Sequence, residues 1–165
     1  MVAPSVIAPL GSSANEQINT VIDGAITVSD ADSPTLASAS VTVTGNYQAG
    51  EDVLAFANAG TTIYGNIVAN FNSSTGALNL TSSGATATVV QWQAALRAVT
   101  YTDTSDAPNT SDRSISFQVN DGAASSNLPI NTVTVTAIDD APSFAAGTGK
   151  VATPIGSLND YGQSA

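Results

Sequence analysis

Residues 132–137 read Thr-Val-Thr-Val-Thr-Ala, and residues 39–44 read Ala-Ser-Val-Thr-Val-Thr. In both runs valine alternates with a hydroxyl residue, which is typical of a strand that is buried on one face and exposed on the other. Residues 25–29 (Ala-Ile-Thr-Val-Ser) and 114–119 (Ser-Ile-Ser-Phe-Gln-Val) are similar. Because Gly, Asn, Asp and Pro separate these runs at short intervals, the sequence predicts an all-β protein built as an antiparallel β-sandwich.

The middle of the chain contains weaker strand signals. We expect short strands at residues 61–64, 67–71 and 77–81. Residues 73–76 read Ser-Ser-Thr-Gly, a composition that favours a turn between the last two of these strands.

One segment has a different periodicity. Near residues 88–98, Val89, Trp92 and Leu96 recur at helical spacing, and Thr88 can cap the first turn. We therefore expect a short helix that crosses one end of the sandwich and leads into a strand at residues 99–102. A single Trp on the apolar face of an amphipathic helix is more often a core residue than a sugar-binding platform, so we place Trp92 in the core.

The composition argues against most enzyme chemistry. The 165 residues include 13 acidic and 3 basic side chains, no His and no Cys, and the formal net charge is -10. The chain therefore lacks the usual proton shuttle, thiolate nucleophile and zinc-thiolate ligands. Paired carboxylates could hydrolyse glycosides, but the few aromatic residues do not indicate a sugar-binding cleft. We expect a non-enzymatic protein that does not bind nucleic acid and does not span a membrane.

Several of the acidic residues follow predicted strands. They are Asp30, Asp32, Asp121, Asp139 and Asp140, and Glu16 lies before the first predicted strand. Loops at strand ends can converge, and Ca²⁺ prefers six to eight oxygen ligands of this kind. Two other interpretations stay open, namely turns closed by Asx hydrogen bonds at Asp30 and Asp32, and a solvated linker at Asp139 and Asp140.

The remaining acids have simpler interpretations. Glu51 and Asp52 are expected in a polar loop before an apolar strand, and Asp103 and Asp106 are expected to form turns. Asp112 and Arg113 are adjacent and are expected to form an ion pair that supports their loop.

Three stretches resemble cadherin repeats. Residues 28–34 (Val-Ser-Asp-Ala-Asp-Ser-Pro) are similar to the Asp-x-Asp segment of that family. Residues 117–122 (Phe-Gln-Val-Asn-Asp-Gly) and residues 132–142, which end in Ile-Asp-Asp-Ala-Pro, resemble its last two strands and its acidic linker. The likeness is greatest to the longer cadherin-like repeats of large bacterial surface and secreted proteins, and it covers about residues 3–142.

The resemblance implies an Ig-like, Greek-key sandwich with calcium at both ends. Glu16, Asp112, Asp139 and Asp140 would gather at the C-terminal pole, and Asp30, Asp32 and Asp121 would gather at the N-terminal pole. Bound Ca²⁺ would stiffen the joints to neighbouring repeats of the same parent chain. Two departures are present: Ser114 replaces the Glu of the family's Asp-Arg-Glu element, and the linker has fewer acidic and amide ligands.

The two ends of the chain indicate a piece of a longer protein. Residues 3–5 and residues 141–143 both read Ala-Pro-Ser, and the first residues lack the features of a signal peptide. Residues 144–165 resemble the opening of the delta-sixty repeat, a bacterial propeller-type repeat, in Gly-x-Gly-Lys-Val and Asp-Tyr. We therefore expect a sandwich over residues 1–142 and, at 143–165, a linker with a truncated repeat that is disordered or loosely packed.

Three functions are compatible with these observations. The leading one is a calcium-rigidified spacer or adhesion repeat of a secreted or cell-surface bacterial protein. The second is a module that binds a glycan or a surface protein through the insertion at residues 45–84. The third is an accessory domain of a multidomain extracellular hydrolase.

Overall fold

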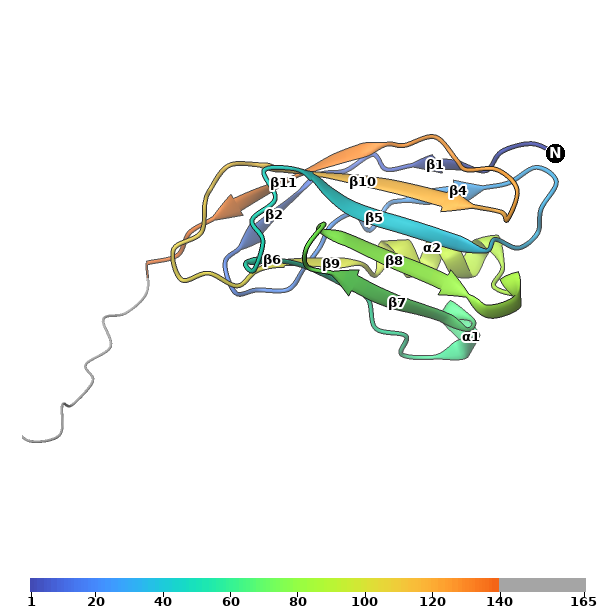
Figure 1. Cartoon of the computed structure of the whole chain (residues 1–165), viewed down its shortest axis with the longest axis horizontal. Coiled ribbons are helices and arrows are strands. Elements are labelled where there is room, and N and C mark those ends of the chain that lie inside the picture. Colours follow the sequence, from blue (N-terminus) through green and yellow to red (C-terminus); the bar gives the residue numbers. More distant parts are fainter. Residues whose placement is uncertain (140–165) are drawn as a thin grey trace, which may run out of the picture.

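The computed structural model describes residues 1–139, and strands dominate it (Figure 1). The strands are β1 (Ser5–Ile7), β2 (Ser12–Asn15), β3 (Thr20–Val21), β4 (Thr27–Ser29), β5 (Ser38–Gly45), β6 (Asp52–Ala55), β7 (Ile67–Asn72), β8 (Ala77–Ser82), β9 (Thr100–Asp103), β10 (Arg113–Asn120) and β11 (Ile130–Thr136). Two short helices, α1 (Thr61–Tyr64) and α2 (Val89–Arg97), and a 3-10 turn (Ser83–Ala85) complete the described part.

The strands form two layers. One layer is a six-stranded sheet in the order β2-β11-β10-β5-β8-β7, and the other contains the pair β1-β4, the sheet β3-β9-β6 and helix α2. All pairs are antiparallel except β2 and β11, which run parallel. Because the first strands are divided between the layers, β1 beside β4 and β2 beside β11, the topology is an Ig-like Greek key. The predicted fold class is confirmed.

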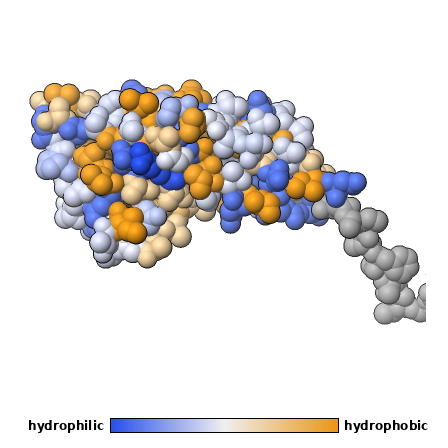
Figure 2. Space-filling model, turned by 180° about the vertical axis from the view of Figure 1, so that it is seen from behind, coloured by the Kyte–Doolittle hydropathy of each residue, from blue (hydrophilic) through white to orange (hydrophobic). Residues whose placement is uncertain are grey.

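The alternation in the sequence accounts for the core between the layers. In β11, Val133 and Val135 are buried while Thr134 and Thr136 are exposed, and Val41 and Val43 of β5 are buried in the same way. The outer face of the second layer is less uniform, and Figure 2 shows apolar side chains spread among polar ones there. Each layer therefore has one apolar face directed at the other, as the strand periodicity predicts.

Helix α2 confirms the predicted helix. Thr88 and Gln91 form a capping box, with Gln91 N–H donating to Thr88 Oγ1 at 3.3 Å and Thr88 N–H donating to Gln91 Oε1 at 3.0 Å. Trp92 is fully buried, and its Nε1–H donates to the carbonyl of Leu36 at 3.0 Å. The core interpretation of Trp92 is therefore correct.

Helix α2 also provides hydrogen-bond partners for β4. Val28 N–H donates to Gln93 Oε1 at 3.1 Å, and Arg97 Nε–H donates to the carbonyl of Ile26 at 2.6 Å. These side chains bond to backbone groups that a neighbouring strand would otherwise pair. The helix thus lies within the second layer alongside β4.

Residues 61–64 form the single helical turn α1, so the predicted strand there is wrong. Asn58 Oδ1 accepts the N–H of Gly60 at 3.0 Å, which closes an Asx turn immediately before the helix. Gly65 ends the turn with φ of 58°, a conformation that glycine adopts without strain. The predicted strands at 67–71 and 77–81 are correct and form the hairpin β7–β8.

Replacing Trp92 by Ala should lower the free energy of unfolding by about 3–5 kcal/mol, because it removes the largest core side chain and leaves a cavity. Val90, on the same helix, is 73% exposed, so Val90→Ala should change stability by less than about 0.5 kcal/mol. Urea unfolding followed by circular dichroism measures both. Equal effects would contradict the assignment of Trp92 to the core.

Candidate functional site

The predicted ligands lie at the two ends of the long axis. The loops after β4 and β10 are at the end that carries the N-terminus, whereas β2 and β11 finish, and β10 begins, at the opposite end (Figure 1). The structure therefore places Asp30, Asp32 and Asp121 at one end, and Glu16, Asp112 and Asp139 at the other. Asp140 and the predicted propeller-type tail lie outside the described residues.

Asp30 closes the turn that follows β4. Its Oδ1 accepts the N–H groups of Asp32 at 3.0 Å and Ser33 at 2.9 Å, so the Asx-turn interpretation is correct for this oxygen. Its Oδ2 is buried and has no hydrogen-bond partner within the described part of the chain. One oxygen of Asp30 thus has a structural role, and the other remains available to a ligand.

Asp121 is arranged like Asp30. Its Oδ1 accepts the N–H groups of Ala123 and Ala124, both at 2.7 Å, and its Oδ2 is buried without a partner among residues 1–139. Asp32 is more exposed, and its Oδ2 accepts the N–H of Val2 at 2.8 Å. This hydrogen bond lowers the pKa of the Asp32 carboxyl.

Glu16 is the buried acid at the opposite end, with 4% of its surface exposed. It follows β2, and its Oε1 accepts the N–H of Ile138 at 2.9 Å. Its Oε2 is buried and has no partner within residues 1–139. Asp112 and Asp139 are exposed. The structure thus brings Glu16 against the residue that precedes Asp139.

The described residues do not gather into a closed metal site. Within residues 1–139 there is no group of three or more Asp, Glu, His or Cys side chains that could hold an ion by itself. No helix in this part of the chain is long and apolar enough to cross a membrane.

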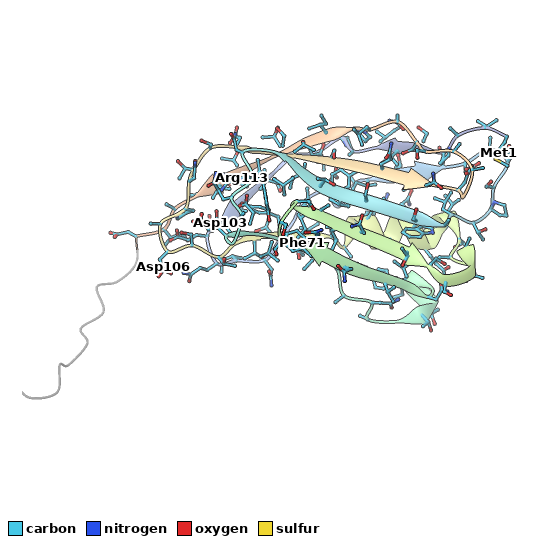
Figure 3. The ribbon with its side chains drawn as sticks, viewed as in Figure 1. Met1, Phe71, Asp103, Asp106 and Arg113 are labelled. Atoms are coloured by element: carbon cyan, nitrogen blue, oxygen red, sulfur yellow. The ribbon has the colours of Figure 1, made fainter. Side chains whose placement is uncertain are left out.

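The strongest electrostatic feature is a buried network around Arg113 that the sequence analysis missed. Arg113 is fully buried, and its Nε–H donates to the Asp52 carboxylate at 2.9 Å while its Nη2–H donates to Asp103 Oδ2 at 3.1 Å. Its Nη1–H groups donate to the carbonyls of Asn109 at 2.8 Å and Ser111 at 2.5 Å. Because Arg113 belongs to β10 and the two aspartates belong to β6 and β9, the network joins the two layers (Figure 3).

Tyr101 completes this network. Its hydroxyl donates to Asp52 Oδ1 at 2.5 Å in a fully buried position. Burial raises the pKa of the Tyr101 phenol, and the hydrogen bond to Asp52 raises it further. Burial opposes the charge on Arg113, but the hydrogen bonds and negative charges of Asp52 and Asp103 prevail and raise its pKa.

Two interpretations of single acids are corrected here. Asp52 is 1% exposed and opens strand β6, so it is not part of a polar loop. Asp112 precedes β10, is exposed and does not pair with Arg113, whose side chain is directed into the core. Arg113 is in phase with the inward-facing residues Ile115 and Phe117, and this phase was the signal in the sequence that its side chain is buried.

The expected turn role of Asp103 is correct but incomplete. Its Oδ1 accepts the N–H of Ser105 at 2.9 Å, as in an Asx turn, while its Oδ2 pairs with Arg113. Asp106 is exposed and accepts a hydrogen bond from the side chain of Gln17. Asp103 is in phase with the buried Tyr101 of β9, whereas Asp106 lies beyond the end of that strand.

Comparisons with known proteins give one similarity. No family model matches this chain, and no curated protein matches it. Among solved structures, the seventh ScaB type I cohesin from Pseudobacteroides cellulosolvens is similar, with 16% sequence identity and a TM-score of 0.48. The match covers 88% of this chain and 99% of that chain. The resemblance to cadherin-like repeats stays a prediction.

Replacing Arg113 by Met should lower the free energy of unfolding by about 3–5 kcal/mol, because two buried carboxylates lose their cation. The matched control is Asp112→Asn, which removes the exposed neighbouring charge and should change stability by less than about 0.5 kcal/mol. Urea unfolding measures both. A loss below about 1 kcal/mol for Arg113→Met would show that the network does not hold the layers together.

Tyr101 should make the fold sensitive to alkaline pH. Its pKa is raised in the folded state, so stability is retained below the unfolded tyrosine pKa of about 10 and falls above it by up to about 1.4 kcal/mol per pH unit. Tyr101→Phe should be less stable at pH 8, because the hydrogen bond to Asp52 is lost, but should show a shallower decline above pH 10. Urea unfolding at a series of pH values measures the slopes, and parallel slopes would contradict the assignment.

Proposed function

We propose that this chain is a non-enzymatic, calcium-binding repeat of a larger secreted or cell-surface bacterial protein, where it acts as a rigid spacer or adhesion module. The observation that supports this is a set of buried carboxylate oxygens without hydrogen-bond partners in the described part of the chain. They are Oε2 of Glu16, Oδ2 of Asp30 and Oδ2 of Asp121. A buried, unpaired carboxylate oxygen costs free energy, and a bound cation would remove that cost.

The donor set suits a hard cation. All candidate ligands are oxygens, and Ca²⁺ accepts carboxylates, backbone carbonyls and water together. At one end Glu16 would contribute its unpaired oxygen, and the exposed carboxylates of Asp112 and Asp139 could join it. At the other end Asp30, Asp32 and Asp121 would serve in the same way.

Within residues 1–139 neither end gathers three carboxylates into one group, so the proposed module would use ligands from a neighbouring repeat. A neighbouring repeat, together with Asp140 in the linker, would complete the coordination. The ion would then neutralise part of the net charge of -10 and couple the two units. Calcium would supply the stiffness that disulfides supply in other extracellular proteins, since this chain has no cysteine.

Millimolar Ca²⁺ should raise the melting temperature by roughly 5 °C relative to EDTA, because it binds only the folded state. Glu16→Gln should reduce this increase, since it removes the charge on the buried, unpaired oxygen at one end. Glu51→Gln is the matched control and should leave the increase unchanged. Thermal unfolding followed by circular dichroism measures the three proteins.

Magnesium at the same concentration tests ion selectivity in this experiment and should have a smaller effect, because Mg²⁺ requires a tighter, octahedral shell. A melting temperature that does not respond to Ca²⁺ would rule out calcium binding by this chain alone. Equal responses of Glu16→Gln and the unsubstituted protein would remove Glu16 from the site.

A further inference from the structure

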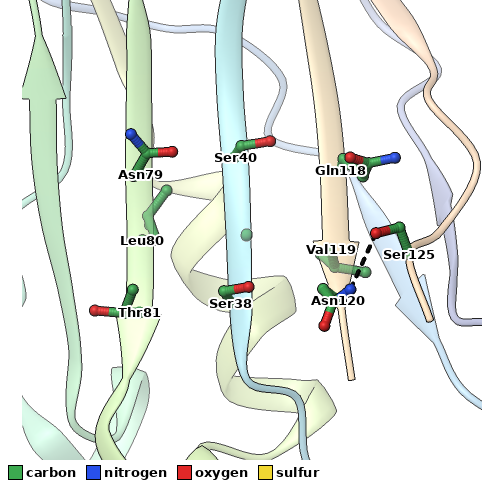
Figure 4. A pocket seen from close by; sticks show the side chains of 10 residues that line it. Ser38, Ser40, Asn79, Leu80, Thr81, Gln118, Val119, Asn120 and Ser125 are labelled. Carbon is green, nitrogen blue, oxygen red and sulfur yellow. Dashed lines mark hydrogen bonds between the residues drawn. The ribbon is translucent and has the colours of Figure 1, made fainter. Parts of the chain in front are cut away.

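A trough runs along β5 on the outer face of the six-stranded sheet. Figure 4 shows its side chains, which come from β8, β5, β10 and the loop after β10. Ser40 lies opposite Asn79 on one side and Gln118 on the other. Two residues earlier on the same face of β5, Ser38 lies opposite Thr81 and Asn120. Short serines thus form the floor, and mostly longer side chains form the walls.

The wall on β10 is held in place by hydrogen bonds. Gln118 Nε2–H donates to the carbonyl of Ser126 at 3.2 Å, and Asn120 Nδ2–H donates to Ser125 Oγ at 3.0 Å. Asn120 Oδ1 also accepts the N–H of Gly122 at 2.7 Å. These contacts fix the amides before any ligand arrives, which lowers the entropy cost of binding.

The floor and the opposite wall retain their hydrogen-bonding capacity. The side chains of Ser38, Ser40, Asn79 and Thr81 make no hydrogen bond within residues 1–139. The hydroxyls of Ser38 and Ser40 and the amide oxygen of Asn79 lie on the trough side, whereas the Thr81 hydroxyl is directed away from β5 (Figure 4). Two hydroxyls and one amide are therefore open to a ligand in the trough. A ligand with many hydroxyl groups could pair with each of them.

The trough carries no charge, although the chain as a whole is strongly acidic. The outward-facing residues of β5, β8 and β10 are all Ser, Thr, Asn, Gln or Ala. An anionic ligand would be repelled by the net charge of -10, and a cationic ligand would find no carboxylate in the trough. The trough also lacks the aromatic, Met and Arg side chains that are enriched in protein interfaces, so a sugar chain would be held there by hydrogen bonds and not by ring stacking.

We propose that this trough binds an uncharged, hydroxyl-rich chain, namely a neutral polysaccharide laid along β5. Binding rests on hydrogen bonds from Ser38, Ser40 and Asn79, with Gln118 and Asn120 as the fixed wall. No acidic residue lines the trough, so binding there does not use the carboxylates of the proposed calcium sites, although its end at Asn120 adjoins Asp121. This binding would let a spacer repeat adhere to a neutral glycan through the outer face of its six-stranded sheet.

Affinity gel electrophoresis in EDTA tests the proposal without any contribution from calcium. The probes are three neutral polymers (dextran, xylan and laminarin) and one anionic polymer (alginate). At least one neutral polymer should slow the protein, and alginate should not. Ser40→Tyr fills the floor and should weaken the retardation at least tenfold, and Asn79→Ala should weaken it about fivefold through the loss of one amide.

The matched control is Thr134→Tyr, an outward position on β11 of the same sheet that does not line the trough. It should bind like the unsubstituted protein, and the melting temperature of each variant verifies its fold. The proposal is overturned if no neutral polymer slows the protein, if alginate does so equally, or if Ser40→Tyr has no effect. Sedimentation that shows a dimer dissociated by Ser40→Tyr would instead identify a second copy as the occupant.

Discussion

The ion pairs of Arg113 with Asp52 and Asp103 fix how the two layers of the sandwich meet. Apolar contacts between sheets are not directional, so they permit the layers to slide against each other, whereas a guanidinium between two carboxylates permits one alignment. The network contains two negative groups and one positive group, and the hydrogen bond from Tyr101 partly compensates the excess. Replacing one partner of a buried ion pair leaves an uncompensated charge, so we expect the network to favour this alignment of the layers over others.

The same network positions the end of the molecule that carries Glu16. The carbonyl of Asp103 accepts the N–H of Gln17 at 2.7 Å, and the carbonyl of Glu51 accepts the N–H of Thr104 at 2.9 Å. The chain around Glu16 is therefore tied to the strands that hold the buried ions. The carboxylates at this end are therefore held by a packed, hydrogen-bonded core, and such support fixes the geometry of a binding site before a ligand arrives.

The fold could be predicted from the sequence because it depends on local alternation, and alternation is visible in single runs such as residues 39–44 and 132–137. The helix was visible for the same reason, since Trp92 and Leu96 repeat at helical spacing. The segment 61–64 was not, because its conformation depends on the Asx turn at Asn58. The role of Arg113 was missed because its partners are 61 and 10 residues away, and only the folded chain shows which acids meet it.

The parallel pairing of β2 with β11 determines how this domain responds to tension. Residues 12–15 lie beside residues 133–136; only β1 precedes β2 in the chain, and β11 is the last described strand. A force that pulls the chain from both sides acts on these two strands in opposite directions along their length. Their hydrogen bonds are loaded together in shear, whereas a hairpin pulled from its open end breaks one bond at a time. The domain is therefore built to carry load before it unfolds.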